Sequence, residues 1–130
     1  MELTSPALSE GDTVPDRFTC KGDDLSPPLA WADVPEATSE LRVSLTDPDA
    51  PGGNFLHWLV TGIDPSSPGV GQGAVPPGGT EQENGFGEAN YRGPCPPAGD
   101  SPHRYLFVVE ALDEIGVVLG SAELATSYGR

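Results

Sequence analysis

The stretch LRVSLT at residues 41–46 alternates apolar and polar side chains without interruption. Because successive side chains of a strand point to opposite faces, this two-residue period predicts a β-strand with one buried face. Two further stretches, LHWLVTGI at residues 56–63 and YLFVVEAL at residues 105–112, are apolar on both faces. That composition is typical of central strands that are covered on each side, so we predict a sheet built on these segments.

The residues between these stretches are rich in glycine and proline. The chain of 130 residues holds 17 glycines and 15 prolines, and both residue types break helix interiors. Residues 17–20 and 119–127 are weaker strand candidates, and no longer segment shows a convincing helical period. We therefore predict a mostly β protein, an antiparallel β-sandwich or barrel with long loops and little helix. The length favours a single domain over residues 1–130.

Long loops separate the predicted strands at residues 47–54, 65–79 and 93–102. Loops on a rigid sheet are common places for binding sites. The stretch GVGQG at residues 69–73 superficially resembles a phosphate loop, but VPPGG at residues 75–79 cannot open a helix and no lysine follows. It is therefore interpreted as a plain surface loop.

The chain carries 20 acidic residues against 6 basic ones, a net charge of −14. This balance excludes general binding to nucleic-acid backbones or anionic membrane surfaces, which needs clustered lysine and arginine. The acidic residues are spread from Glu2 to Glu123, a distribution that suits a surface kept soluble at high salt, as in a halophilic organism. An ordinary acidic protein is the alternative.

No run of residues approaches the roughly 18 apolar residues of a membrane span. The first residues, MELTSP, lack both a basic start and an apolar stretch, so we expect a cytoplasmic protein. The two cysteines, Cys20 and Cys95, form no CxxC motif, and free thiols are the rule in a reducing compartment. We expect no Cys20–Cys95 bridge, no metal site and no cofactor.

The only two histidines, His57 and His103, each lie beside a polar cluster. His57 interrupts an apolar strand, where a polar ring without partners costs free energy. Taken alone, it is more often a satisfied core residue than a site, and Asp47 at a strand exit could be simple turn chemistry. Because all of these residues fall at the ends of predicted strands, a common site is the hypothesis that we favour.

Four short segments carry a resemblance to a known family: DPDAP at residues 47–51, HW at 57–58, GPCPP at 93–97 and HRY at 103–105. In this order they resemble the phosphatidylethanolamine-binding protein family, and more narrowly its bacterial and archaeal Raf-kinase-inhibitor-like branch. The early stretch from PDRFTC to Trp31 and the ending from AEL to YGR are similar as well. The resemblance covers nearly the whole chain and implies a sheet-rich sandwich with a small anion pocket at one end.

The resemblance also implies which residues form that pocket. The expected ligand-binding positions are Asp47, His57, Tyr91, Gly93, Pro94, Cys95, His103 and Tyr105. The expected rim consists of Phe55, Pro96 and Pro97. Imidazoles, a phenol and glycine-flanked backbone amides donate hydrogen bonds, so they suit a small phosphate-like head without any lysine. Tightly turned loops of the family also make the Ala50–Pro51 peptide bond a candidate for the cis form.

We expect a non-catalytic binding or regulatory protein for a small anionic or phosphorylated ligand. The resemblance implies a kinase or a protease as the protein partner. A hydrolase is the alternative, with His57, His103 and Asp47 around a metal or with Cys95 and His103 as a thiol pair. A purely structural interaction domain with two buried histidines is a third reading.

One segment departs from the family pattern. Relatives usually carry a helical segment between the region of residues 111–113 and the last strand, whereas here only residues 114–117 bridge that gap. Relatives are often dimeric, so the resemblance implies a homodimer as one oligomeric state. The shortened segment weakens the transfer of any contact that the helix makes in relatives.

Overall fold

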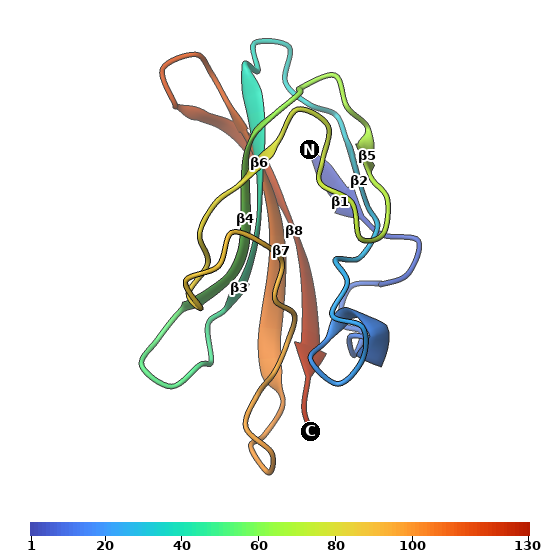
Figure 1. The fold of residues 1–130 in the computed structure, drawn as a ribbon. Coiled ribbons are helices and arrows are strands. Elements are labelled where there is room, and N and C mark those ends of the chain that lie inside the picture. The colour runs from blue at the N-terminus through green and yellow to red at the C-terminus, as the bar shows by residue number, and fades with distance from the viewer.

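The computed structural model describes residues 1–130 and places nearly all regular structure in two antiparallel sheets (Figure 1). The larger sheet has five strands in the order β6-β4-β3-β7-β8. They are β3 (Glu40–Asp47), β4 (Phe55–Ile63), β6 (Thr80–Glu81), β7 (His103–Leu112) and β8 (Val118–Tyr128). The predicted mostly β, antiparallel sandwich is confirmed, and β8 confirms the weaker strand candidate at residues 119–127.

The central strand β3 keeps the alternation that its sequence predicts. Leu41, Val43 and Leu45 are fully buried, whereas the residues between them are partly exposed. Leu45 is paired in register with Trp58 of β4 and with Phe107 of β7, and both of these side chains are also fully buried. Each large buried apolar side chain contributes about 1.5–3 kcal/mol. A slip of one residue would expose the whole row, so this burial fixes the register of the three strands.

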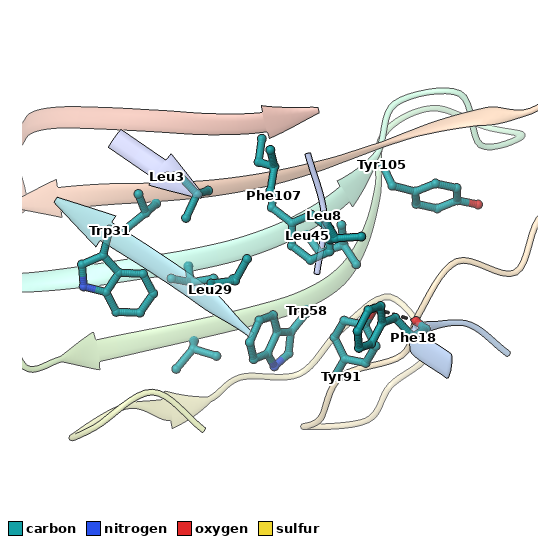
Figure 2. Packing of buried hydrophobic residues seen from close by; sticks show 14 of the residues in the cluster. Leu3, Leu8, Phe18, Leu29, Trp31, Leu45, Trp58, Tyr91, Tyr105 and Phe107 are labelled. Atoms are coloured by element: carbon teal, nitrogen blue, oxygen red, sulfur yellow. Dashed lines mark hydrogen bonds between the residues drawn. The ribbon is translucent and has the colours of Figure 1, made fainter. Parts of the chain in front are cut away.

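A second sheet of three strands, in the order β1-β2-β5, lies beside the larger sheet (Figure 1). Its strands are β1 (Glu2–Thr4), β2 (Leu29–Ala32) and β5 (Gly69–Val70). Leu29 and Trp31 are the buried residues of β2, and the indole Nε1 of Trp31 donates to the carbonyl oxygen of Ser67 at 2.7 Å. Figure 2 shows these side chains in one apolar layer with Leu45 and Phe107 of the larger sheet.

The strand candidate at residues 17–20 is wrong, because the chain there forms a 3-10 helix, η1 (Asp16–Phe18). Pro15, with φ of −60°, precedes the helix, and the backbone amides of Phe18 and Thr19 donate to carbonyl oxygens three residues back. Phe18 is fully buried and anchors the turn in the core. No helix in the structure is of a length and apolarity that would carry it through a membrane.

The loop after β3 contains no cis peptide bond, so the expected cis form of Ala50–Pro51 is wrong. The backbone amide of Gly53 donates to the carbonyl oxygen of Ala50 at 3.0 Å, and Gly52 has φ of 88°. Proline followed by a glycine with positive φ is typical of a type II turn, which accepts a trans proline at its second position. The tight turn is therefore made by the glycine rather than by a cis bond.

Strands β7 and β8 are joined by a short turn at residues 113–117, with no helix between them. The carboxylate of Asp113 accepts the backbone amides of Ile115 and Val117, which closes the turn on itself. Ile115 is 82% exposed, so nothing in this chain covers the tip of the hairpin. The turn lies at the opposite end of β7 from His103 (Figure 1).

Candidate functional site

The ends of three strands meet at one end of the larger sheet. Because β3 runs antiparallel to both β4 and β7, its last residue, Asp47, lies beside the first residues of those strands. Strand β4 contributes His57 there, and β7 contributes His103 and Tyr105. A cavity of about 160 Å³ opens between them. Its lining consists of Asp47, Ala50, Pro51, Phe55, His57, Phe86, Cys95, Pro96, Pro97, His103 and Tyr105.

A buried carboxylate–imidazole pair lies in the wall of this cavity. The Nδ1 atom of His103 donates to Oδ2 of Asp47 at 2.7 Å, and both side chains are buried. The Nε2 atom of His103 lies 3.2 Å from Oδ2 of Asp100. The hydrogen bond to Asp47 raises the pKa of His103, and Asp100 adds to the effect. A protonated imidazole can donate to both carboxylates at once, so this arrangement favours the charged form of His103.

The loop after β3 is fastened to β7 by a second carboxylate. The carboxylate of Asp49 accepts the backbone amide of Arg104 and two guanidinium nitrogens at 2.8–3.0 Å. These hydrogen bonds lower the pKa of Asp49 to about 2. The backbone amide of Asp49 in turn donates to Oδ1 of Asp47 at 2.8 Å. The hydrogen bonds of Asp47 and Asp49 thus fix the loop that places Ala50 and Pro51 in the cavity wall.

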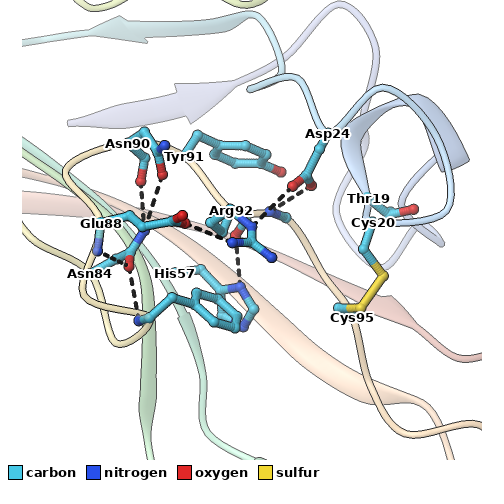
Figure 3. A network of polar contacts seen from close by, with 12 residues as sticks. Thr19, Cys20, Asp24, His57, Asn84, Glu88, Asn90, Tyr91, Arg92 and Cys95 are labelled. Atoms are coloured by element: carbon cyan, nitrogen blue, oxygen red, sulfur yellow. Dashed lines mark hydrogen bonds and ion pairs between the residues drawn. A yellow bond between two sulfur atoms is a disulfide. The ribbon is translucent and has the colours of Figure 1, made fainter.

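His57 is held in a different way from His103. Its Nδ1 atom lies 2.7 Å from the carbonyl oxygen of Arg92 and therefore donates to it (Figure 3). Burial lowers the pKa of His57 despite this contact, so the ring is neutral over a wider pH range than a free histidine. The rings of Phe55, Phe86 and Tyr105 meet the imidazole edge-on, with centroids 5.2–5.6 Å away.

Three of the residues expected at the site do not line the cavity: Tyr91, Gly93 and Pro94. The phenol of Tyr91 donates to the carbonyl oxygen of Phe18 at 2.7 Å, and the amide of Gly93 donates to Oδ1 of Asp24 at 2.8 Å. A Cβ atom at Gly93 would collide with the Phe18 carbonyl oxygen, so glycine permits this close approach. These residues hold the wall from behind and offer no group to the cavity.

Cys20 and Cys95 form a disulfide, so the expectation of two free thiols is wrong. Their Cα atoms lie 5.4 Å apart, within the range that a disulfide spans. The chain reaches this distance because the backbone amide of Cys20 donates to the carbonyl oxygen of Pro94 at 3.2 Å and the neighbouring wall binds Asp24. Figure 3 shows the bridge joining the segment after η1 to the cavity wall. Cys95 therefore carries no thiol that could act with His103.

Sequence reasoning missed the contributions of Phe86, Ala50 and Pro51 to the lining. Phe86 is 43% exposed, packs edge-on against Phe55 with centroids 4.9 Å apart, and lies under the Arg92 guanidinium at 4.6 Å from its centroid. An aromatic residue between two glycines was the available signal in the sequence. The metal alternative finds no support, because no three His, Cys, Asp or Glu side chains are arranged to hold an ion.

Comparisons with known proteins agree with this geometry. The family model for the phosphatidylethanolamine-binding protein matches residues 4–127. A UPF0098 protein of Methanothermobacter thermautotrophicus is 36% identical over 152 aligned positions, which include 100% of this chain and 99% of that protein. The crystal structure of E. coli YbcL, described as a new member of the mammalian PEBP family, has a TM-score of 0.93 at 29% identity and covers 99% of this chain and 98% of its own.

A shorter match exists with LppC of Mycobacterium tuberculosis, which is 42% identical over 109 residues. These residues make up 84% of this chain but 54% of LppC, so the chain spans about half the length of that relative. The PEBP homolog CT736 of Chlamydia trachomatis has a TM-score of 0.90 at 33% identity, with 99% of this chain and 97% of that chain covered. Sequence and fold agree over almost the whole length, and the chain belongs to the phosphatidylethanolamine-binding protein family.

Proposed function

We propose that this protein is a non-catalytic binding protein whose cavity takes a small phosphate-like headgroup. The main support is a cavity of about 160 Å³ at the strand ends whose wall holds two imidazole rings, His57 and His103. Pockets for drug-sized ligands measure about 300–1,000 Å³, so this cavity suits a group the size of an oxyanion rather than a larger molecule.

The donor that supports this ligand is the phenol of Tyr105. Burial raises the pKa of Tyr105, and the charge of Asp47 raises it further, so the phenol keeps its proton at neutral pH. The apolar rim of Phe55, Pro96 and Pro97 leaves room above the cavity for the rest of a phosphorylated molecule. A protein partner of kinase or protease type remains part of this proposal on the strength of the family alone.

Catalysis has less support than binding. The thiol of Cys95 is consumed in the disulfide, and the Asp47 carboxylate already accepts hydrogen bonds from His103 and Asp49. A nucleophile needs an adjacent base that is free to take its proton. Both ring nitrogens of His103 already have carboxylate partners, so His103 is not free to act as that base. We therefore favour binding over hydrolysis for this cavity.

A phosphate titration followed by NMR tests the proposal. The protein has only two histidines, so its imidazole C–H signals report on both sides of the cavity. We expect inorganic phosphate to shift both signals with one saturating curve. If neither signal moves up to millimolar phosphate while the protein stays folded, the cavity is not an oxyanion site.

We also propose that the acidic surface is an adaptation to high salt. With 20 acidic residues against 6 basic ones, self-repulsion is strong at low salt and is screened at molar salt, where the Debye length falls to about 3 Å. We expect the thermal midpoint to rise between low and molar KCl, and a flat or falling midpoint would reject this adaptation. The cytoplasmic location loses support, because disulfides are rare in reducing compartments.

A further inference from the structure

The exposed apolar side chains of this protein gather at the tip of the β7–β8 hairpin. Of the six large apolar side chains that are most exposed, four lie there: Ile115, Val117, Val118 and Leu119, with exposed fractions between 39% and 82%. The other two, Val75 and Phe86, lie in loops on either side of β6. Single exposed apolar side chains are ordinary, whereas a contiguous patch of them commonly marks a contact surface.

The pairing of the two strands turns this patch outward. Neighbouring side chains of a regular strand point to opposite faces, so one of Val118 and Leu119 is expected to face the core. The register shifts at this point, because Leu112 pairs with Val118 while Ala111 pairs with Gly120, and Leu119 is left as an extra residue in β8. A bulge of this kind redirects side chains, and both Val118 and Leu119 are exposed. The exposure is therefore fixed by the hairpin itself.

An acidic hollow of about 550 Å³ lies beside the patch. Its lining consists of Glu36, Ala37, Thr38, Ser39, Asp113, Glu114 and Ile115. The carboxylates of Glu36 and Glu114 are exposed and take part in none of the ion pairs of the protein. Asp113 uses Oδ1 to accept the backbone amides of Ile115 and Val117, which leaves Oδ2 for another donor. Because Ile115 belongs to both the patch and the hollow, the two surfaces are continuous.

We propose that the hairpin tip and this hollow form a docking surface for a segment of another protein that carries lysine or arginine beside apolar side chains. The apolar side chains of the segment cover the patch, and its basic side chain enters the hollow and meets Glu36, Asp113 and Glu114. A second copy of this chain fits less well, because with 6 basic residues against 20 acidic ones it brings like charges together. The surface lies at the opposite end of β7 from the cavity, so the proposal is independent of the proposed function (Figure 1).

The patch and the hollow contribute to this docking in different ways. Covering an exposed apolar side chain such as Ile115 supplies most of the affinity, because it removes apolar area from water. Each exposed ion pair in the hollow adds about two- to fivefold in affinity and selects the charge of the partner. Salt screens the ion pairs and leaves the apolar contact intact. We therefore expect the affinity to fall with rising KCl and then to level off.

Isothermal titration with three blocked decapeptides tests the proposal. One peptide contains lysine and leucine in equal number, the second has glutamate in place of lysine, and the third has serine in place of leucine. We expect the lysine–leucine peptide to bind at least about tenfold more tightly than either of the others. It should shift the backbone amide NMR signals of residues 36–39 and 113–119. Equal binding of the lysine–leucine and lysine–serine peptides would overturn the proposal, because attraction to the net charge of −14 would then explain the binding.

Two variants and two matched controls locate the binding. Ile115→Ser should weaken the lysine–leucine peptide about tenfold, whereas Val75→Ser, the same kind of change outside the patch, should leave its affinity unchanged. Glu114→Gln should weaken it about two- to fivefold, whereas Glu83→Gln, with the same loss of charge outside the hollow, should not. All four side chains are exposed, so we expect unchanged thermal midpoints. Equal losses in variants and controls would place the binding elsewhere and overturn the proposal.

Sedimentation velocity tests the other occupant of this surface, a second copy of the chain. We expect Ile115→Ser to leave the oligomeric state of the protein unchanged. A dimer of the wild-type protein that this substitution dissociates would show that a second copy covers the patch, and it would overturn the proposal.

Discussion

The two histidines of the cavity have the same side chain and opposite surroundings. On the β7 side, Nδ1 of His103 meets a carboxylate, and its pKa rises. On the β4 side, Nδ1 of His57 meets a backbone carbonyl, and burial lowers its pKa. The comparison teaches that a carboxylate partner raises the pKa of an imidazole, whereas burial lowers it even where a ring nitrogen donates to a backbone carbonyl.

The difference also divides the cavity into two sides with separate roles. The His103 side holds an imidazole between two carboxylates and is tied to the strand ends through Asp47. The His57 side supplies an unprotonated nitrogen and is tied to the disulfide-bonded wall through Arg92.

Asp47→Ala breaks the His103 side and has the largest expected effect. Removing one partner of a buried, hydrogen-bonded ion pair costs about 3–5 kcal/mol, and here it leaves His103 with the more exposed Asp100 as its one carboxylate partner. We expect urea denaturation to show this loss at pH 6, where His103 is protonated. The matched control is Asp49→Ala, whose partner Arg104 is exposed, and its effect should be clearly smaller. Equal losses in the two variants would contradict the importance of the buried pair.

Reduction of the Cys20–Cys95 disulfide loosens the His57 side. The bridge spans 75 residues, and a disulfide of this kind stabilises by about 2–4 kcal/mol, chiefly by restricting the unfolded chain. We expect dithiothreitol to lower the urea midpoint by a corresponding amount and to leave the Cys20→Ser/Cys95→Ser variant unchanged. The unreduced, unfolded protein should not react with a thiol reagent. Two modified cysteines in that experiment would show that no bridge exists.

A pH titration of the free protein compares the two rings directly and changes stability least. We expect the C–H signals of His103 to titrate above the ordinary value of about 6.5 and those of His57 below it. The dependence of folding stability on pH therefore has opposite signs for the two rings. The stabilisation from His103 is complete below pH 6.5 and is lost as pH rises through its folded pKa, whereas that from a neutral His57 is present above pH 6.5 and is lost as pH falls. Coincident midpoints, or midpoints in the reverse order, would remove the distinction between the two sides.

The central sheet could be predicted because its signals are local. Alternation over residues 41–46 and apolar runs in the neighbouring stretches need only the strand period to be read correctly. The strands of the second sheet, at Leu29–Ala32 and elsewhere, are too short for any period to show. The segment at residues 17–20 has an apolar pattern that a single helical turn can also satisfy, and only the packing of Phe18 decides between them.

The residues of the cavity could be named from the sequence more readily than their orientations. The family motifs contain Asp47, His57 and His103, which line one cavity, but no sequence pattern tells which way an amide or a phenol points. Gly93 and Tyr91 lie behind the predicted wall of the cavity. The amide of Gly93 and the phenol of Tyr91 point away from the cavity, toward Asp24 and Phe18. The cysteine pairing failed for the same reason, because proximity across 75 residues is a property of the folded chain.

The placement of His103 and the hairpin turn at opposite ends of β7 has a consequence for how the sequence can change during evolution. His103 begins β7 and the turn at residues 113–117 follows its end, so the whole length of the strand, about 3.4 Å per residue, separates them. An insertion or deletion at that turn alters the hairpin tip, where Ile115 is exposed, without moving an atom of the cavity lining. Length variation and the cavity therefore lie at opposite ends of β7, and either can change while the other stays constant.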